Sequence, residues 1–377
     1  MNKQICKTGL ALSGGGFRAT LFHVGALWRL NELGLMESID EITSVSGGSI
    51  IAAYLGYKWN ELQFNIDHVA TNFEEIIVKP IVLFCGHTID VGTILGGIIN
   101  PVKRPSELLI NKYRKHLFCD ATLHDLPGTG KGPRFTIYAT SMQTGASVRF
   151  TRDYLGEYHL GKIMNPVLKL AVAVAASSAF PPPLCPVKVD VDASAWQKSN
   201  ISNLHDDSYL KSTMWLVDGG VYDNLGLERI VKSCDILLIS DAGAPFSLQR
   251  KMICSRLSQL ARTKRTLDIM SEQIRALRTR DLIAKYIAGT NRGAYWGIGV
   301  NIDEYPLKDK NLPPALVKDS DVTRAISKMR TRLNKFDEKE QGQLINWGYS
   351  LADSALRSRF NSDLPAATHL PIQTYPI

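Results

Sequence analysis

The stretch ITSVSGGS, residues 42–49, places three serines and a glycine pair after two β-branched residues, and the apolar run IIAAYLGY follows at 50–57. Residues 41–46 are predicted to form a short strand, and a helix is predicted from residue 50. A strand that turns sharply into a helix around a central serine is the pattern of a nucleophile elbow. Ser46 has the central position, so this stretch predicts either an exposed nucleophile or a simple turn.

The elbow pattern is imperfect in this chain. It usually has Gly two residues before the nucleophile, and Ser44 stands there instead. We interpret Ser44 as a small flanking residue, Ser49 as a helix-start residue, and Gly48 as a residue that lets the turn pack closely. On this stretch alone, the turn and the nucleophile remain open interpretations.

A second glycine-rich turn precedes the elbow by one strand. Residues 8–13 are predicted to form a buried strand that ends in Gly14, Gly15 and Gly16, and a helix is expected from Phe17. The backbone N–H groups of residues 14–17 and the helix dipole would form an anion site, and beside a serine nucleophile that becomes an oxyanion hole. Arg18 would either stabilise this turn or face a phosphate.

The same turn also fits a cofactor-binding pattern. Gly14, Gly16 and Ala19 satisfy the dinucleotide fingerprint G-x-G-x-x-G/A, which expects an acidic residue at the end of the second strand. That strand ends in Ser44, Val45 and Ser46 instead. An NAD-dependent oxidoreductase therefore stays only a minority alternative.

A nucleophilic serine needs a base. Asp218 in WLVDGGVYDNLG (215–226) ends an apolar strand, and Gly219 and Gly220 allow another loop to approach the carboxylate closely. Asp241 in LLISDAGAP (237–245) has a similar context and is the rival base. None of the eight histidines lies in a strand-end motif.

Four motifs occur in a fixed order: GGGFRA (14–19), SVSGGS (44–49), AVAASSAFPPP (173–183) and DGG (218–220). Together they resemble the patatin-like phospholipase family over roughly residues 8–245. The resemblance implies a three-layer α/β/α fold with a mostly parallel central sheet, and a Ser-Asp dyad that needs neither histidine, metal nor cofactor. It assigns Ser46 as nucleophile, Asp218 as base and residues 14–17 as oxyanion hole. Ser13 and Ala19 depart from the Asp and Gly that are usual in the family.

The strand and helix order indicates two regions. Residues 1–245 are expected to form the catalytic core with a helical, cap-like insertion at about 61–118, and residues 246–377 a mostly helical region packed on that core. The insertion contains the apolar region 76–99, which Lys79, Pro80, His87 and Asp90 interrupt, so it fails as a transmembrane helix. A lid or membrane-docking surface and a buried helical hairpin are both open interpretations of it.

Composition is that of a soluble enzyme, with 45% hydrophobic and 21% charged residues. Six widely spaced cysteines without a C-x-x-C motif argue against a metal site or a disulfide framework and favour a reducing cytoplasm. The formal net charge is +8. Nine cations between Arg250 and Arg280 form either a solvated helix face or a patch for anionic lipid headgroups or a nucleotide.

The expected function is hydrolysis of fatty acyl esters in membrane glycerophospholipids by a serine esterase of the phospholipase A type. We expect a cytoplasmic protein in peripheral contact with the inner membrane face, and no nucleic acid polymer as partner. Some bacterial members of the family are nucleotide-activated effectors of antiphage defence. A cyclic-nucleotide activator and a homo-oligomer are therefore kept as alternatives, and headgroup and acyl-position specificity are not readable from the sequence.

Overall fold

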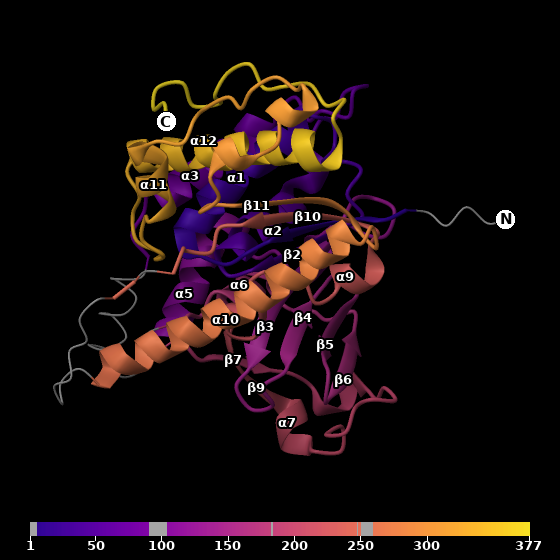
Figure 1. The fold of residues 1–377 in the computed structure, drawn as a ribbon. Coiled ribbons are helices and arrows are strands. Elements are labelled where there is room, and N and C mark those ends of the chain that lie inside the picture. Colours follow the sequence, from indigo (N-terminus) through magenta and orange to yellow (C-terminus); the bar gives the residue numbers. More distant parts are fainter. Residues whose placement is uncertain (1–5, 90–103, 182–183, 247, 250–258) are drawn as a thin grey trace.

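An eleven-stranded sheet runs through the molecule, with helices on both of its faces (Figure 1). The structure is a computed structural model that describes residues 6–89, 104–181, 184–246, 248–249 and 259–377. Five central strands are parallel, in the order β11-β10-β1-β2-β3. Their bounds are Thr8–Leu12 (β1), Glu41–Val45 (β2), Arg134–Ser141 (β3), Ile236–Asp241 (β10) and Arg292–Gly297 (β11).

Antiparallel strands extend the sheet beyond β3. They are β4 (Ser147–Phe150), β5 (Tyr154–Glu157), β6 (Gly161–Met164) and β8 (Trp196–Gln197). A further pair, β7 (Val187–Asp190) and β9 (Thr213–Asp218), joins the sheet where β9 pairs with β3. β2 and β9 meet on β3 in successive rows, because Val45 is opposite Tyr138 and Asp218 is opposite Ala139.

The side chains of β1 alternate between two hydrophobic cores. Leu10 and Leu12 belong to the larger core, whereas Ala11 belongs to a smaller one on the opposite face, as the two-residue period of a strand requires. The helices α1 (Gly16–Glu32), α2 (Gly47–Lys58) and α12 (Glu338–Ala355) contribute to the first core, and α9 (Ile230–Ser233) and α10 (Gln259–Ile287) to the second. The predicted three-layer α/β/α fold with a parallel central sheet is confirmed.

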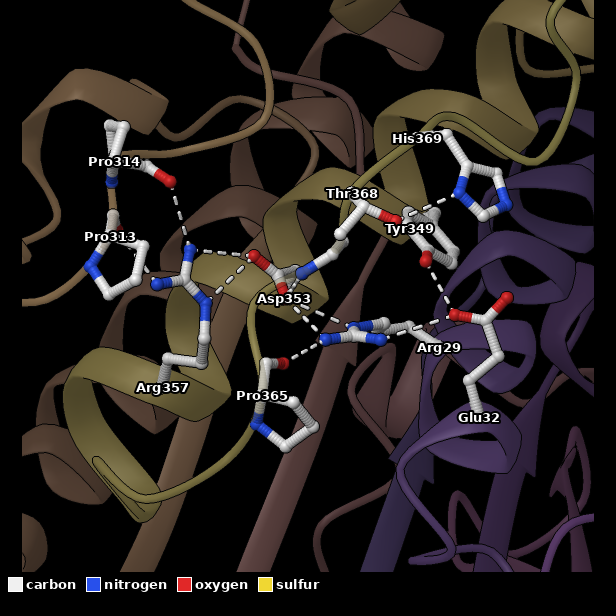
Figure 2. A network of polar contacts seen from close by, with 11 residues as sticks. Arg29, Glu32, Pro313, Pro314, Tyr349, Asp353, Arg357, Pro365, Thr368 and His369 are labelled. Carbon is white, nitrogen blue, oxygen red and sulfur yellow. Dashed lines mark hydrogen bonds and ion pairs between the residues drawn. The ribbon is translucent and has the colours of Figure 1, made fainter.

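A buried polar network fastens α12 to α1 (Figure 2). Asp353 on α12 accepts from Arg29 Nε at 3.0 Å and forms an ion pair with Arg357 at 2.8 Å. Arg29 also pairs with Glu32 at 3.2 Å and donates to the carbonyl of Pro365. Since the carboxylate of Asp353 is fully buried, removing either arginine would leave it partly uncompensated. The network thus holds the C-terminal segment against the helix that begins at the glycine-rich turn.

The C-terminal region completes the sheet as well as covering it. β11 pairs with β10 over six residues, and α12 packs against α1. On the other face, two cations of the predicted basic cluster point inward: Arg275 pairs with Asp241 at 3.1 Å and Arg278 with Asp223 at 3.3 Å. These two arginines anchor α10 to the core and are not part of a free cationic surface.

The predicted insertion is helical but irregular. It contains η1 (Trp59–Glu61), the π-helices η2 (Glu74–Val78) and η3 (Arg114–Phe118), and the helices α3 (Lys79–Cys85) and α5 (Pro105–Tyr113). Ile77, Ile81 and Phe84 are buried, as expected for the hairpin interpretation, whereas Leu83 is 68% exposed. The predicted apolar residues Ile94, Leu95, Ile98 and Ile99 lie outside the described residues.

Shorter elements complete the chain. They are η4 (Leu123–Asp125), α6 (Leu170–Ser177), η5 (Ala193–Ala195), α7 (Ser208–Ser212), α8 (Gly220–Asp223), η7 (Ile302–Glu304), η8 (Lys308–Lys310), α11 (Asp321–Ser327) and η9 (Leu356–Phe360). Across the described part of the chain, every helix is too short or too polar to span a membrane.

Candidate active site

Ser46 lies at a sharp bend between β2 and α2. Its φ of 51° is positive, which costs a non-glycine residue of order 1–3 kcal/mol and persists only where the surroundings enforce it. The surroundings do so by close packing: a Cβ on Gly48 would lie 2.3 Å from the carbonyl oxygen of Leu12, and one on Gly47 would lie 2.0 Å from that of Gly16. The elbow geometry expected from the sequence is therefore present.

A buried chain of serines holds the bend. The backbone N–H of Ser46 donates to Ser177 Oγ at 3.0 Å, and Ser177 Oγ is 2.8 Å from Ser49 Oγ. Ser49 in turn donates to Ser44 Oγ at 3.0 Å. Ser44, which stands where the elbow pattern has glycine, thus accepts a hydrogen bond that a glycine could not accept. Sequence reasoning missed Ser177, although it lies within the AVAASSAFPPP motif.

For the ester hydrolysis that the family resemblance implies, Ser177→Ala is expected to lower the rate about 10- to 100-fold, because the Ser46 N–H loses its acceptor and Ser46 is held less firmly. A buried donor left unpaired also costs about 1–3 kcal/mol of folding stability. Kinetics on a short-chain ester and thermal melting measure the two effects.

Ser178→Ala is the matched control, since its hydroxyl contacts Tyr113 and the carbonyl of Val174 instead of the elbow. Equal losses in both variants would contradict a specific role for Ser177.

Asp218 reaches Ser46 because β9 enters beside the end of β2. The Asp218 carboxylate lies beside the Ser46 side chain and accepts the N–H of Gly220 at 2.7 Å. Asp218 is 3% exposed. Burial raises the pKa of Asp218 to about 6, and the N–H of Gly220 and the nearby Ser46 side chain limit that rise. A Cβ on Gly219 would lie 2.5 Å from the carbonyl of Tyr138, so this glycine permits the close approach.

The rival base, Asp241, has different partners. It lies at the end of β10, where its carboxylate accepts from Tyr295 at 2.7 Å, from the N–H of Gly243 at 2.8 Å, and from Arg275 at 3.1 Å. Three donors on a fully buried carboxylate indicate a structural role in holding α10 and β11.

The histidine nearest the glycine turn has a structural role too. His23 is fully buried and is hydrogen-bonded to Ser240 and to the carbonyl of Ser13. Burial lowers the pKa of His23 to about 4, so the ring is neutral near pH 7 and belongs to the core.

The glycine-rich turn touches the elbow but offers fewer free amides than the sequence predicts. The N–H of Gly14 donates to the carbonyl of Asn224, and the N–H of Phe17 donates to that of Arg332, both at 3.0 Å. Within the described residues, the N–H groups of Gly15 and Gly16 have no protein acceptor. The predicted four-amide oxyanion hole therefore narrows to two donors at the N-terminus of α1.

Arg18 stabilises this turn. Its side chain is fully buried and donates to the carbonyl of Met329 at 2.9 Å and to that of Ala242 at 2.6 Å. Burial lowers its pKa to about 10, so it stays protonated near pH 7. Of the two roles considered for Arg18, the structure supports stabilisation of the turn.

A dinucleotide fits poorly at the same turn. The backbone of Arg332 lies against Gly16, where a Cβ would be 2.7 Å from the Arg332 carbonyl oxygen. The space beside Gly16 that a bound pyrophosphate would need is thus filled by the backbone of Arg332. The searched, described residues contain no cluster of three or more His, Cys, Asp or Glu suited to a metal ion.

Comparisons with known proteins identify the family and the fold. A family model described as "Patatin-like phospholipase" matches residues 10–230. Human GIVD cytosolic phospholipase A2, solved with methyl gamma-linolenyl fluorophosphonate, aligns with 12% identity and a TM-score of 0.52. The alignment covers 93% of this chain but only 58% of that one.

VipD from Legionella pneumophila aligns with 14% identity, a TM-score of 0.36, and coverage of 94% and 67%. No curated protein sequence matches the chain.

Proposed function

The chain belongs to the patatin-like phospholipase family of lipid acyl hydrolases, and we propose that it cleaves fatty acyl esters of membrane glycerophospholipids through Ser46 and Asp218. The observation that carries the proposal is the buried carboxylate of Asp218, which lies beside the Ser46 side chain and has its pKa raised to about 6. A carboxylate with its pKa raised toward neutrality is a stronger base than a free one and is still ionised at pH 7.

In the proposed mechanism, Ser46 Oγ attacks the ester carbonyl while Asp218 takes the hydroxyl proton. The N–H groups of Gly15 and Gly16 bind the oxyanion of the tetrahedral intermediate. Protonated Asp218 gives its proton to the leaving alcohol oxygen as the ester bond breaks. Asp218 then removes a proton from water, which attacks the acyl-Ser46 carbonyl. As the bond from the acyl carbon to Ser46 Oγ breaks, Asp218 returns the proton to Ser46 Oγ and the fatty acid is released.

Incubation of the purified protein with phosphatidylcholine and phosphatidylethanolamine vesicles tests the function. Mass spectrometry is expected to detect free fatty acid and lysophospholipid in equal amounts, and the lysophospholipid isomer identifies the position cleaved. If the protein hydrolyses simple esters but leaves the phospholipids intact, it is an esterase and not a phospholipase.

The pH dependence follows from the pKa of Asp218. The base works only when ionised, so kcat/KM is expected to rise about tenfold per pH unit below pH 6 and to level off above it. The measurement uses an uncharged ester substrate between about pH 4.5 and 8. A profile that is flat through pH 6 would remove Asp218 from the role of base.

Membrane contact is proposed at α3, beside the glycine-rich turn. Phe84 packs edge-on against Phe17 at 5.4 Å, so α3 adjoins the site, and its neighbour Leu83 is exposed. Phe84 itself, at 2% exposed, belongs to the core. An exposed leucine beside a lipid-hydrolysing site is suited to insertion at the bilayer interface.

Leu83→Glu is expected to reduce flotation with lipid vesicles several-fold, because a charged side chain opposes insertion into the acyl region. Ile66→Glu is the matched control: Ile66 is 91% exposed, but its loop packs at the opposite end of α1, near Asn31 and Gly34. Unchanged flotation of a folded Leu83→Glu protein would refute docking through α3.

A further inference from the structure

A pocket of about 550 Å³, lined in part by charged side chains, lies outside the proposed dyad and glycine turn. Its lining comes from the β3–β4 turn, from the loop after β5 and from the segment after α8. It includes Ser147, Arg149, Tyr158, His159, Tyr222 and Lys232. Its size is in the range of pockets that enclose a small molecule.

Three cations line this pocket, and two of them have carboxylate partners. Arg229 is paired with Glu41 and also donates to the hydroxyl of Tyr154, while Lys232 is paired with Glu228 at 2.7 Å. Arg149 differs: among the described residues no acidic side chain forms an ion pair with it, and its Nε is buried without a hydrogen-bond acceptor. Of the three cations that line the pocket, Arg149 is thus the one without an ion pair among the described residues.

A second unpaired group lies next to Arg149. Tyr138 on β3 is directly opposite Arg149 on β4, and opposite residues of an antiparallel pair share one face of the sheet. Tyr138 is 3% exposed, and its hydroxyl also lacks a hydrogen-bond partner in the described structure. Of these two residues, Arg149 lines the pocket and Tyr138 lies behind it on β3.

We propose that this pocket binds a small soluble molecule that carries a phosphate group. The planar guanidinium of Arg149 suits bidentate contact with phosphate oxygens, and Lys232, His159 and the hydroxyl of Ser147 add donors around it. The exposed ring of Tyr158 provides an aromatic surface at the same pocket.

The pocket adjoins the loop of the proposed base without including it. Tyr222 is four residues after Asp218, and its ring is covered by Arg278 at 5.7 Å. The binding proposal does not depend on the hydrolase function, because its readout is ligand binding.

Isothermal titration of the full chain with AMP, with inorganic phosphate and with adenosine tests the proposal. AMP and phosphate are expected to bind and adenosine to bind at least about tenfold more weakly than AMP, since the charge-assisted contacts are lost. Absence of binding by both AMP and phosphate up to about 10 mM would overturn it. Arg149→Gln is expected to weaken AMP binding about tenfold or more, and unchanged affinity in this variant would also overturn it.

Arg324→Gln serves as the matched control, because Arg324 is on α11 and pairs only with the exposed Asp321. If Arg149→Gln fails to fold, a labelling experiment on the wild-type protein still tests the site. Phenylglyoxal labelling of Arg149, followed by peptide mass spectrometry, is expected to slow in the presence of AMP while labelling of Arg324 continues. Equal labelling of Arg149 with and without AMP would contradict the proposed site.

Discussion

Replacing Ser46 by alanine is expected to abolish ester hydrolysis, with a fall in kcat of at least about 1,000-fold. The variant lacks the atom that attacks the carbonyl, and neither Ser44 nor Ser49 can substitute, because their hydroxyls are hydrogen-bonded to each other inside the core. The fold should persist, since an alanine at this position keeps the backbone N–H that contacts Ser177.

Two measurements check this expectation. A fluorophosphonate probe should label wild-type protein at Ser46 and leave Ser46→Ala unlabelled, and vesicle hydrolysis should fall in parallel. Ser44→Ala is the matched control, because it removes a buried serine two residues away while keeping the nucleophile. Labelling that persists in Ser46→Ala would move the nucleophile to another residue.

Replacing Asp218 by asparagine is expected to lower kcat about 1,000- to 10,000-fold, because the amide is nearly isosteric with the carboxylate but cannot accept the serine proton. The N–H of Gly220 can still donate to the amide oxygen, so the local structure should be retained. The pH profile of kcat/KM in this variant should also lack the rise toward pH 6.

Asp241→Asn separates the two acidic residues. This variant removes the charge that Arg275 faces, and breaking a buried pair costs about 3–5 kcal/mol of folding stability. We therefore expect the Asp241→Asn variant to have a lower Tm but to keep its hydrolase activity at temperatures below that Tm. Loss of activity in a folded Asp241→Asn protein, with activity retained in Asp218→Asn, would reverse the assignment of the base.

Several features of the fold were predictable because they depend only on residues close together in the sequence. The strands β1, β2, β9 and β10 were expected from apolar runs bounded by turns, and glycines 14–16 correctly placed the start of α1. The short strands β5 to β8 were not, since two to four residues carry too little periodicity to distinguish a strand from a loop.

The oxyanion site shows where local reasoning stops. The glycines after β1 indicated which amides could bind an anion, but the carbonyl that occupies the N–H of Phe17 comes from Arg332 in the C-terminal region. A hydrogen bond between segments so distant in sequence leaves no local pattern. A cyclic-nucleotide activator and a homo-oligomer stay predictions of the family resemblance.

The sequence by itself indicated a strand, a small-residue turn and a helix around Ser46, because these follow one another in neighbouring residues. Only the tertiary structure decided which carboxylate meets that serine. Asp218 and Asp241 both end apolar strands before a small-residue turn, but β9 pairs antiparallel with β3 in the row next to Val45, whereas β10 lies across β1. Strand order and register are non-local pairings, which no stretch of sequence specifies alone.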